Sequence, residues 1–161
     1  MNPQSPGFLS GEDYATVIRC VPILCVDIVL RLTGSRDYIR TVDGKESSKY
    51  VLFKRNNEPL KNEWWVVGGR VYKGEMAETA ARRKLFEECR LMRGPGELRF
   101  LGFYQEVFAF SSIGRGEYHT LSLVFEAECD PGDIKLDGQH SEWMLSDRLP
   151  QALAICVGES K

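Results

Sequence analysis

The alternation of hydrophobic and polar residues predicts a domain built from both strands and helices. Residues 21–31 form an apolar, β-branched run, which is typical of a buried strand. Four further segments have the alternation, aromatic content or flanking turns of strands, namely residues 49–55, 64–67, 98–110 and 119–128. Residues 64–67 run directly into the glycine pair Gly68-Gly69.

Helical spacing is clearest over residues 76–91, where apolar side chains recur on one side. That stripe consists of Ala77, Ala80, Ala81, Leu85 and Cys89. The glycines and proline of residues 94–96 end the predicted helix. A second helix is predicted over residues 146–155 with Ser146 as its cap, while residues 11–19 fit either a short helix or an extended arm.

The remaining segments are polar and rich in turn residues, so they predict loops. They are residues 33–48, 56–63, 111–117 and 130–142, and residues 1–10 are expected to be loose. Strands and helices do not alternate strictly, which favours an α/β (α+β) fold with a mixed β-sheet sandwiched between helices. The length of 161 residues fits a single domain over residues 1–161.

Composition excludes several classes of protein. The net charge of −2 is not that of a nucleic-acid-binding protein. The longest apolar run, residues 21–30, is interrupted by Asp27 and is too short to span a membrane. The N-terminal residues do not have the pattern of a secretory signal. The five cysteines are odd in number and scattered along the chain, so they predict buried thiols rather than disulfides. A cytoplasmic location is therefore expected.

The predicted helix carries an unusual number of charges. Arg83 and Glu87 are four residues apart, as are Lys84 and Glu88, so each pair shares a helix face. One interpretation is a solvated face with salt bridges. The other is a Mg²⁺–diphosphate site, because a buried strand, a glycine turn and neighbouring carboxylates supply bare backbone and hard oxygen ligands.

This stretch resembles the signature of the Nudix hydrolases. Lys84 stands where the signature has a glutamate, and Arg90 stands where it has a glycine. We interpret the change at Arg90 as a matter of local packing. A charged lysine neither binds Mg²⁺ nor accepts a proton. The positions that match the signature in register are Gly69, Glu75, Arg83, Leu85, Glu87, Glu88 and Leu91.

One branch of this family, the GDP-mannose mannosyl hydrolases, also lacks that glutamate, and the resemblance to it extends beyond the signature. It includes EDYATVIRCVPILCVDIVL, FKRNNEP, EWWVVGGRV and LDGQHSEW. The resemblance implies Mg²⁺, or Mn²⁺, bound by the Gly68 carbonyl, Glu88 and Gln139, with Glu87 as a further candidate. It implies His140 as the general base, a role that suits histidine because its ordinary pKa lies near neutrality.

The same resemblance implies roles for four more residues. Arg55 and Arg70 would neutralise the diphosphate, since guanidinium groups match phosphate oxygens. Arg83 would orient the carboxylates. Asp27, a lone carboxylate in an apolar strand, would either bind substrate or form a structural hydrogen bond.

The activity implied is Mg²⁺-dependent hydrolysis of a nucleotide sugar, GDP-mannose or GDP-glucose, by attack of water on the anomeric carbon with inversion. Two alternatives remain: a conventional Nudix diphosphatase that cleaves the P–O–P link, and a non-catalytic nucleotide-sugar-binding protein. The implied partners are the nucleotide sugar and a second copy of the chain in a homodimer, with neither nucleic acid nor membrane.

Overall fold

The computed structural model describes residues 9–32, 50–94, 96–109, 117–136, 138 and 140–158. Three α-helices and one 3-10 turn occur in this part of the chain: α1 Gly11–Cys20, α2 Ala77–Cys89, α3 Gln151–Ala154 and η1 Pro131–Asp133. The strands are β1 Ile23–Leu32, β2 Tyr50–Arg55, β3 Trp64–Trp65, β4 Val67–Arg70, β5 Arg99–Phe108, β6 Tyr118–Cys129 and β7 His140–Ser146.

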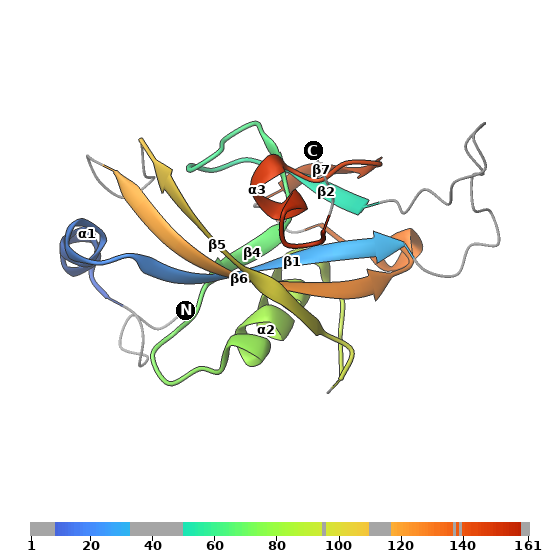
Figure 1. The fold of residues 1–161 in the computed structure, drawn as a ribbon, viewed down its shortest axis with the longest axis horizontal. Coiled ribbons are helices and arrows are strands. Elements are labelled where there is room, and N and C mark those ends of the chain that lie inside the picture. The colour runs from blue at the N-terminus through green and yellow to red at the C-terminus, as the bar shows by residue number, and fades with distance from the viewer. Residues whose placement is uncertain are drawn as a thin grey trace.

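These strands join in one mixed sheet (Figure 1). Its order is β3-β2-β1-β6-β5, with β4 also paired to β1 and β7 to β2. Strands β1 and β6 run parallel over the whole of β1, whereas the other pairs are antiparallel. The α+β fold and its mixed sheet are therefore as the sequence predicted.

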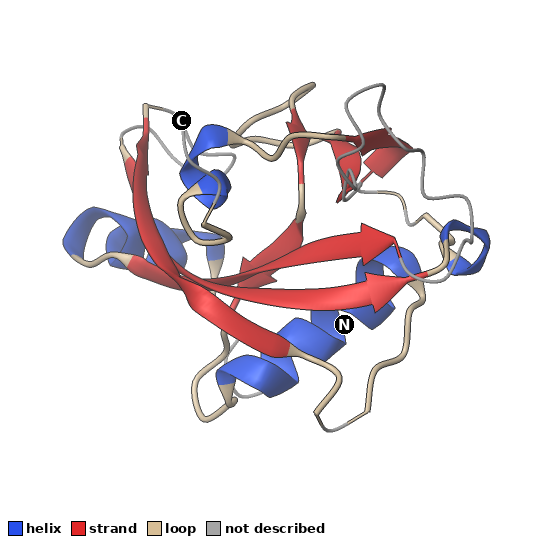
Figure 2. Ribbon diagram, turned by 45° about the vertical axis from the view of Figure 1, so that its right-hand side comes forward, coloured by secondary structure: helices blue, strands red, loops and turns tan. Residues whose placement is uncertain are grey.

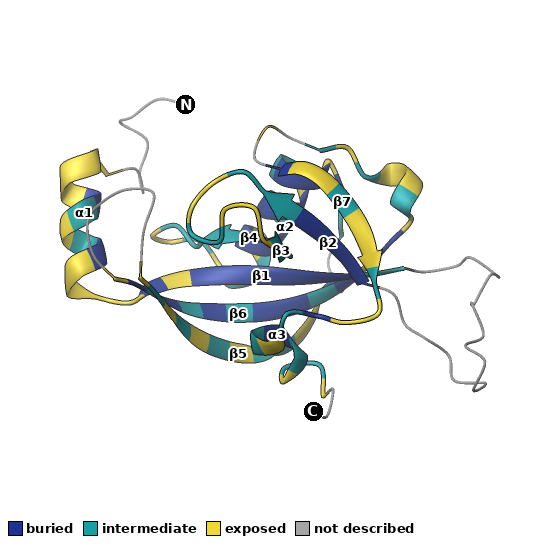
Figure 3. Ribbon diagram, turned by 90° about the horizontal axis from the view of Figure 1, so that it is seen from above, coloured by how far each residue is buried: buried dark blue, intermediate teal, exposed yellow. Residues whose placement is uncertain are grey.

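Strand β1 is the centre of the molecule and is buried on both faces, which explains its nearly continuous apolar sequence. Val26, Ile28 and Leu30 pack into the core between the sheet and α2. Val29 belongs to the core on the opposite face of the sheet, beside Leu153 of α3. Figure 3 shows β1 buried along most of its length, and Figure 2 shows α2 packed beneath the curved strands.

Helix α2 forms as its apolar stripe predicts: Ala80, Ala81, Leu85 and Cys89 are fully buried, and Ala77 packs at their edge. It ends at Arg90, whose backbone is left-handed, with φ 59° and ψ 18°. The Arg90 N–H donates to the carbonyls of Leu85 and Phe86 and so caps the helix. A left-handed cap explains why a glycine would suit this position.

The N-terminal segment is a helix rather than an arm. The Ser10 side chain accepts a hydrogen bond from the Asp13 N–H and caps α1. Tyr14 and Ile18 of α1 pack against Cys25 and Tyr118, so α1 covers one end of the sheet. No helix among the described residues is long and apolar enough to cross a membrane.

Two predictions near the C-terminus are wrong. Residues 140–142, predicted as loop, begin strand β7, which pairs with β2 although its exposed positions do not alternate with buried ones. Ser146 ends that strand and bonds to Arg148 instead of capping a helix. Helix α3 begins only after Pro150, because proline fits a helix start but not its interior. The loops predicted at 33–48 and 111–116, and most of the loose residues 1–10, lie outside the described residues.

Candidate active site

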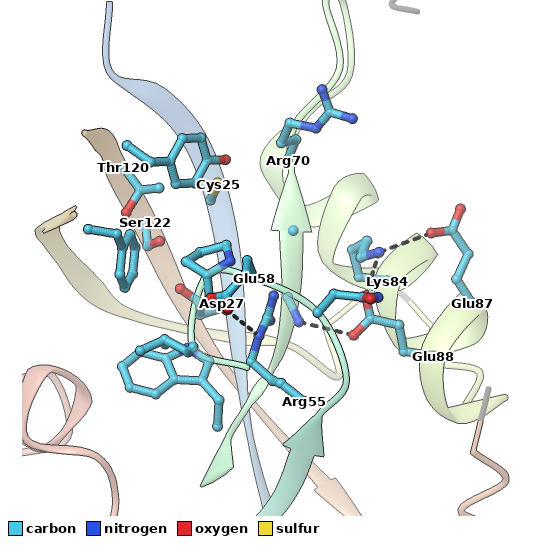
Figure 4. A pocket seen from close by; sticks show the side chains of 18 of the residues that line it. Cys25, Asp27, Arg55, Glu58, Arg70, Lys84, Glu87, Glu88, Thr120 and Ser122 are labelled. Carbon is cyan, nitrogen blue, oxygen red and sulfur yellow. Dashed lines mark hydrogen bonds and ion pairs between the residues drawn. The ribbon is translucent and has the colours of Figure 1, made fainter. Parts of the chain in front are cut away.

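A pocket of about 350 Å³ lies between β1, β4 and α2 and the C-terminal half of β5 and N-terminal half of β6 (Figure 4). Its two ends differ chemically. Cys25, Thr120 and Ser122 lie at one end, and the charged side chains of α2 lie at the other. Arg55 and Arg70 face the space between these ends, so the pocket can hold a ligand with a polar organic part and an anionic part.

The glycine pair, predicted as a turn, lies within strand β4 instead, because both glycines pair with β1, and it brings backbone against side chains from two other elements. Gly68 lies opposite Asp27 in the β1–β4 pair, and a Cβ atom at Gly68 would stand 2.2 Å from Asp27 Oδ1. A Cβ atom at Gly69 would stand 2.7 Å from Lys84 Cε. Glycine at both positions therefore permits β1 and α2 to approach β4 closely.

Glu88 is the most buried of the charged residues in the pocket, with 2% of its surface exposed. Its Oε1 forms an ion pair with the Lys84 ammonium. Its Oε2 accepts a hydrogen bond of 3.4 Å from the Gly68 N–H. The helical spacing of Lys84 and Glu88 predicted this pair, and because the pair is buried, removing either partner would leave an uncompensated charge.

Lys84 also reaches Glu87, with 3.3 Å between Nζ and Glu87 Oε2. Burial opposes the positive charge of Lys84, but the carboxylates of Glu88 and Glu87 outweigh it and raise the pKa of the lysine above its ordinary value. The ammonium is therefore charged at neutral pH and cannot serve as a proton acceptor.

Arg83 is held by several acceptors. Its Nε donates to Glu75 Oε1 at 2.7 Å, and its Nη2 donates to Glu75 Oε2 at 2.8 Å and to the Arg70 carbonyl at 2.9 Å. The Arg83 hydrogen bonds lower the pKa of Glu75, and the same bonds raise the pKa of Arg83 against its burial. Because Arg83 Nη1 also lies 3.3 Å from Glu87, this arginine links β4 to the carboxylates of α2.

His140 enters the pocket from the start of β7, where it pairs with Arg55 of β2. It is buried, its ring lies 5.4 Å from that of Phe53, and its Nε2 is 3.9 Å from Glu88 Oε2. An imidazole can take up a proton, and a carboxylate at this distance lies where it would attract the resulting charge. The pair can therefore accept a proton from a bound molecule and stabilise the resulting charge.

The two candidate phosphate-binding arginines are held differently. Arg55 Nε donates to the Pro59 carbonyl at 2.9 Å. The Arg70 guanidinium lies over the Tyr14 ring, 4.1 Å from its centroid, so α1 supports it from one side. Both arginines line the pocket, as the sequence predicted.

Asp27 has partners that the sequence did not reveal. The Tyr104 hydroxyl donates to Asp27 Oδ2 at 2.7 Å. Burial raises the pKa of Asp27 above its ordinary value of 3.8, whereas hydrogen bonds from Tyr104, Ser122 and Trp65 oppose the rise. These partners come from β5, β6 and β3, so no local sequence pattern could have identified them.

The structure thus brings together nearly all the predicted site residues. Gln139 lies outside the described residues. The pocket lining contains the other predicted residues, namely Asp27, Arg55, Gly68, Arg70, Arg83, Glu87, Glu88 and His140.

The carboxylates of Glu87 and Glu88 are oxygen donors in the pocket that suit a hard divalent cation. The backbone group bonded to Glu88 Oε2 is the Gly68 N–H and not its carbonyl. Among the described residues, no three histidine, cysteine or acidic side chains gather around a common point. A bound cation would therefore need backbone, substrate or water oxygens beside the carboxylates, a pattern usual for Mg²⁺.

Comparisons with known proteins agree with this arrangement. A family model described as the NUDIX domain matches residues 36–155. The low-salt glycan biosynthesis protein Agl8 of Haloferax volcanii is 30% identical over 135 residues, which cover 83% of this chain and 76% of that protein. The ADP-ribose pyrophosphatase of Methanocaldococcus jannaschii is 32% identical over 114 residues. That match covers 68% of this chain and 63% of the pyrophosphatase, which is less than two thirds of its length.

Solved structures support the same fold. The MutT NUDIX hydrolase from Burkholderia pseudomallei superposes with a TM-score of 0.61 at 19% identity, over 88% of this chain and 99% of that one. At this identity the likeness concerns only the arrangement of strands and helices.

Proposed function

Because this chain belongs to the Nudix family, we propose that it hydrolyses a nucleotide sugar, GDP-mannose or GDP-glucose, to the nucleoside diphosphate and the free sugar. Nudix hydrolases generally use divalent metals such as Mg²⁺. The finer proposal concerns the bond that is broken, which is the bond between the anomeric carbon and the phosphate oxygen.

The observation that carries this proposal is the position of His140 beside Glu88 in a site where helix α2 has a lysine at position 84 in place of the glutamate of the signature. Lys84, where such a carboxylate would stand, is charged and cannot accept a proton. Glu88 is bound by Lys84 and the Gly68 N–H. The imidazole of His140 is the candidate base that remains within the pocket at close range.

In the proposed reaction, His140 takes a proton from water as the water oxygen bonds to the anomeric carbon. The bond from that carbon to the diphosphate oxygen breaks, and its electron pair leaves with the nucleoside diphosphate. Glu88, 3.9 Å from Nε2, stabilises the imidazolium that forms. Direct displacement inverts the configuration at the anomeric carbon.

Arg55 and Arg70 would bind the leaving diphosphate, since both line the pocket between its two ends. A divalent cation held by Glu88, with Glu87, Gln139 and the Gly68 carbonyl as further candidate ligands, would supply additional positive charge to the leaving group. Arg83 would orient the carboxylates rather than contact the substrate, because it already donates hydrogen bonds to Glu75 and the Arg70 carbonyl. The polar end near Asp27 and Ser122 would receive an uncharged part of the substrate.

The relative named as a glycan biosynthesis protein supports a sugar-containing substrate. The relative named as an ADP-ribose pyrophosphatase supports a second candidate, a diphosphatase that places water on phosphorus. The structural observation in favour of the second candidate is the adjacent pair Glu87 and Glu88, both of which line the pocket. Such carboxylates can hold a metal-bound diphosphate.

Phosphorus NMR in ¹⁸O-labelled water tests the proposal. The purified protein is incubated with Mg²⁺ and, in separate samples, GDP-mannose, GDP-glucose and ADP-ribose. Unlabelled GDP together with free sugar is the expected result. A nucleoside monophosphate and a sugar phosphate, one of them labelled, would instead assign the diphosphatase.

A non-catalytic binding protein would give a third result. Calorimetry would then detect binding of the GDP-sugar, while NMR would detect no product at any concentration of Mg²⁺ or Mn²⁺. That outcome would reject both hydrolytic proposals.

A further inference from the structure

We propose that the Lys84 ammonium is a built-in cation that fills the position between Glu87 and Glu88, so that a divalent ion cannot bind there. The site then accepts a metal on the Oε2 side of Glu88, the side that faces Gly68 and His140. This inference rests on the metal-dependent hydrolysis proposed above, but it does not depend on which bond the protein cleaves.

The contacts of the ammonium carry the first step. Lys84 Nζ forms an ion pair with Glu88 Oε1 and lies 3.3 Å from Glu87 Oε2. A cation that bridges two carboxylates through one oxygen of each has the position of a bridging metal ion. Glu88 Oε2 points away from this contact, toward the Gly68 N–H at 3.4 Å.

The ion pair between Lys84 and Glu88 is buried. The side chains of Lys84 and Glu88 are 10% and 3% exposed, whereas that of Glu87 is 34% exposed. A buried carboxylate without a nearby cation is costly, so Glu88 requires either a lysine or a metal at this place. Since lysine is part of the chain, it competes with metal ions at a very high effective concentration.

Gly69 of strand β4 leaves a slot for the Lys84 side chain. An added Cβ atom at Gly69 would stand 2.7 Å from Cε, 3.2 Å from Cδ and 3.3 Å from Nζ of Lys84. The aliphatic part of Lys84 therefore crosses the bare backbone of β4 on its way to the carboxylates. This path limits the conformations of a long side chain and directs its ammonium at the pair.

Counting bound Mn²⁺ by electron paramagnetic resonance, without substrate, tests the inference. Lys84→Glu should bind one more Mn²⁺ per chain than the wild type, because the bridging position becomes vacant and gains a carboxylate. Lys84→Met should also gain an ion, with weaker affinity. Arg82→Met is the matched control: it removes a cation that pairs with Glu78 on the same helix, and its Mn²⁺ count should equal that of the wild type.

Equal Mn²⁺ counts in folded wild type, Lys84→Glu and Lys84→Met would overturn the inference. A crystal of the wild type grown with Mn²⁺ provides a test that needs no variant. An anomalous peak within coordination distance of both Glu87 and Glu88 would overturn it, and the absence of such a peak with Lys84 in place would support it. Neither readout depends on the products found by NMR, so failure here is distinguishable from failure of the proposed reaction.

Discussion

The Tyr104 hydroxyl donates a 2.7 Å hydrogen bond to Asp27 Oδ2, across 77 residues of chain. Burial raises the pKa of Asp27 above its ordinary value of 3.8. The folded state therefore holds this proton more tightly than the unfolded state, and the free energy of unfolding falls as pH rises from 3.8 toward the raised pKa.

We expect Tyr104→Phe to raise the pKa of Asp27 further and to reduce the free energy of unfolding by about 1–2 kcal/mol, because a buried hydrogen bond to Asp27 is lost. Urea denaturation between pH 4 and 8 measures this, and Asp27→Asn should reduce the fall in stability with rising pH without removing it, because burial also raises the pKa of Glu106. Tyr118→Phe, which removes a pocket hydroxyl that contacts Tyr14, is the control for the loss of a buried hydroxyl. An unchanged pH dependence of stability in Tyr104→Phe would show that the hydroxyl does not act on Asp27.

The Glu75–Arg83 pair predicts the opposite pH dependence. Arg83 lowers the pKa of Glu75 below its ordinary value of 4.5. The stabilisation is therefore complete above pH 4.5 and is lost as pH falls through the lowered pKa. Glu75→Gln should cost about 2 kcal/mol at pH 7, because two charge-assisted hydrogen bonds are weakened.

Chemical denaturation at pH 7 and at pH 3 checks this expectation, and the cost should shrink at the lower pH. Glu78→Gln is the matched control, since Glu78 pairs with Arg82 on the surface of the same helix and is 45% exposed. That substitution should change stability by less than about 0.5 kcal/mol. A cost for Glu75→Gln that is equal at both pH values would contradict the pairing argument.

The stacking of Tyr14 on Arg70 predicts an effect on substrate binding. Tyr14→Leu removes the ring beneath the guanidinium, and a cation–π contact worth about 0.5–1 kcal/mol corresponds to a two- to fivefold rise in KM. The turnover number should stay unchanged, because Tyr14 supports only binding. Tyr14→Phe keeps the ring and should keep the wild-type KM. Equal rises in both variants would implicate the hydroxyl, which lies 3.4 Å from the Tyr118 hydroxyl.

The left-handed backbone of Arg90, an exposed residue, predicts that two substitutions there differ in stability. Its left-handed backbone, with φ 59°, disfavours any residue that has a Cβ atom. Arg90→Gly should therefore be more stable than Arg90→Ala by about 1 kcal/mol, although both lose the contact of the guanidinium with Phe86. Thermal denaturation of the two variants measures the difference. A more stable alanine variant would mean that the cap does not keep this conformation.

The two histidines of the chain provide a direct test of the proposed base. His140→Ala should lower the turnover number on the order of 10²–10⁴-fold. His119→Ala is the control, because His119 does not line the pocket. Steady-state kinetics with the substrate found by NMR gives the comparison. A small effect of His140→Ala beside a large effect of Glu87→Gln would favour attack on phosphorus.

The sequence by itself determined the features that depend on one element. The apolar run of β1, the stripe of α2, and the ion pairs Lys84–Glu88 and Arg83–Glu87 all follow from local periodicity. These predictions hold because residues three or four apart on a helix, or two apart on a strand, have a fixed relation.

The tertiary structure decided the features that join separate elements. His140 reaches Glu88 because β7 pairs with β2 in one particular register, and Tyr104 reaches Asp27 because β5 and β1 both flank β6. The sequence around β7 lacked the alternation of a strand. The helix after it begins later than predicted, because Pro150 stands at its N-cap. Contacts of this kind depend on which strands pair and in what register, and the sum of packing over the whole core fixes that choice.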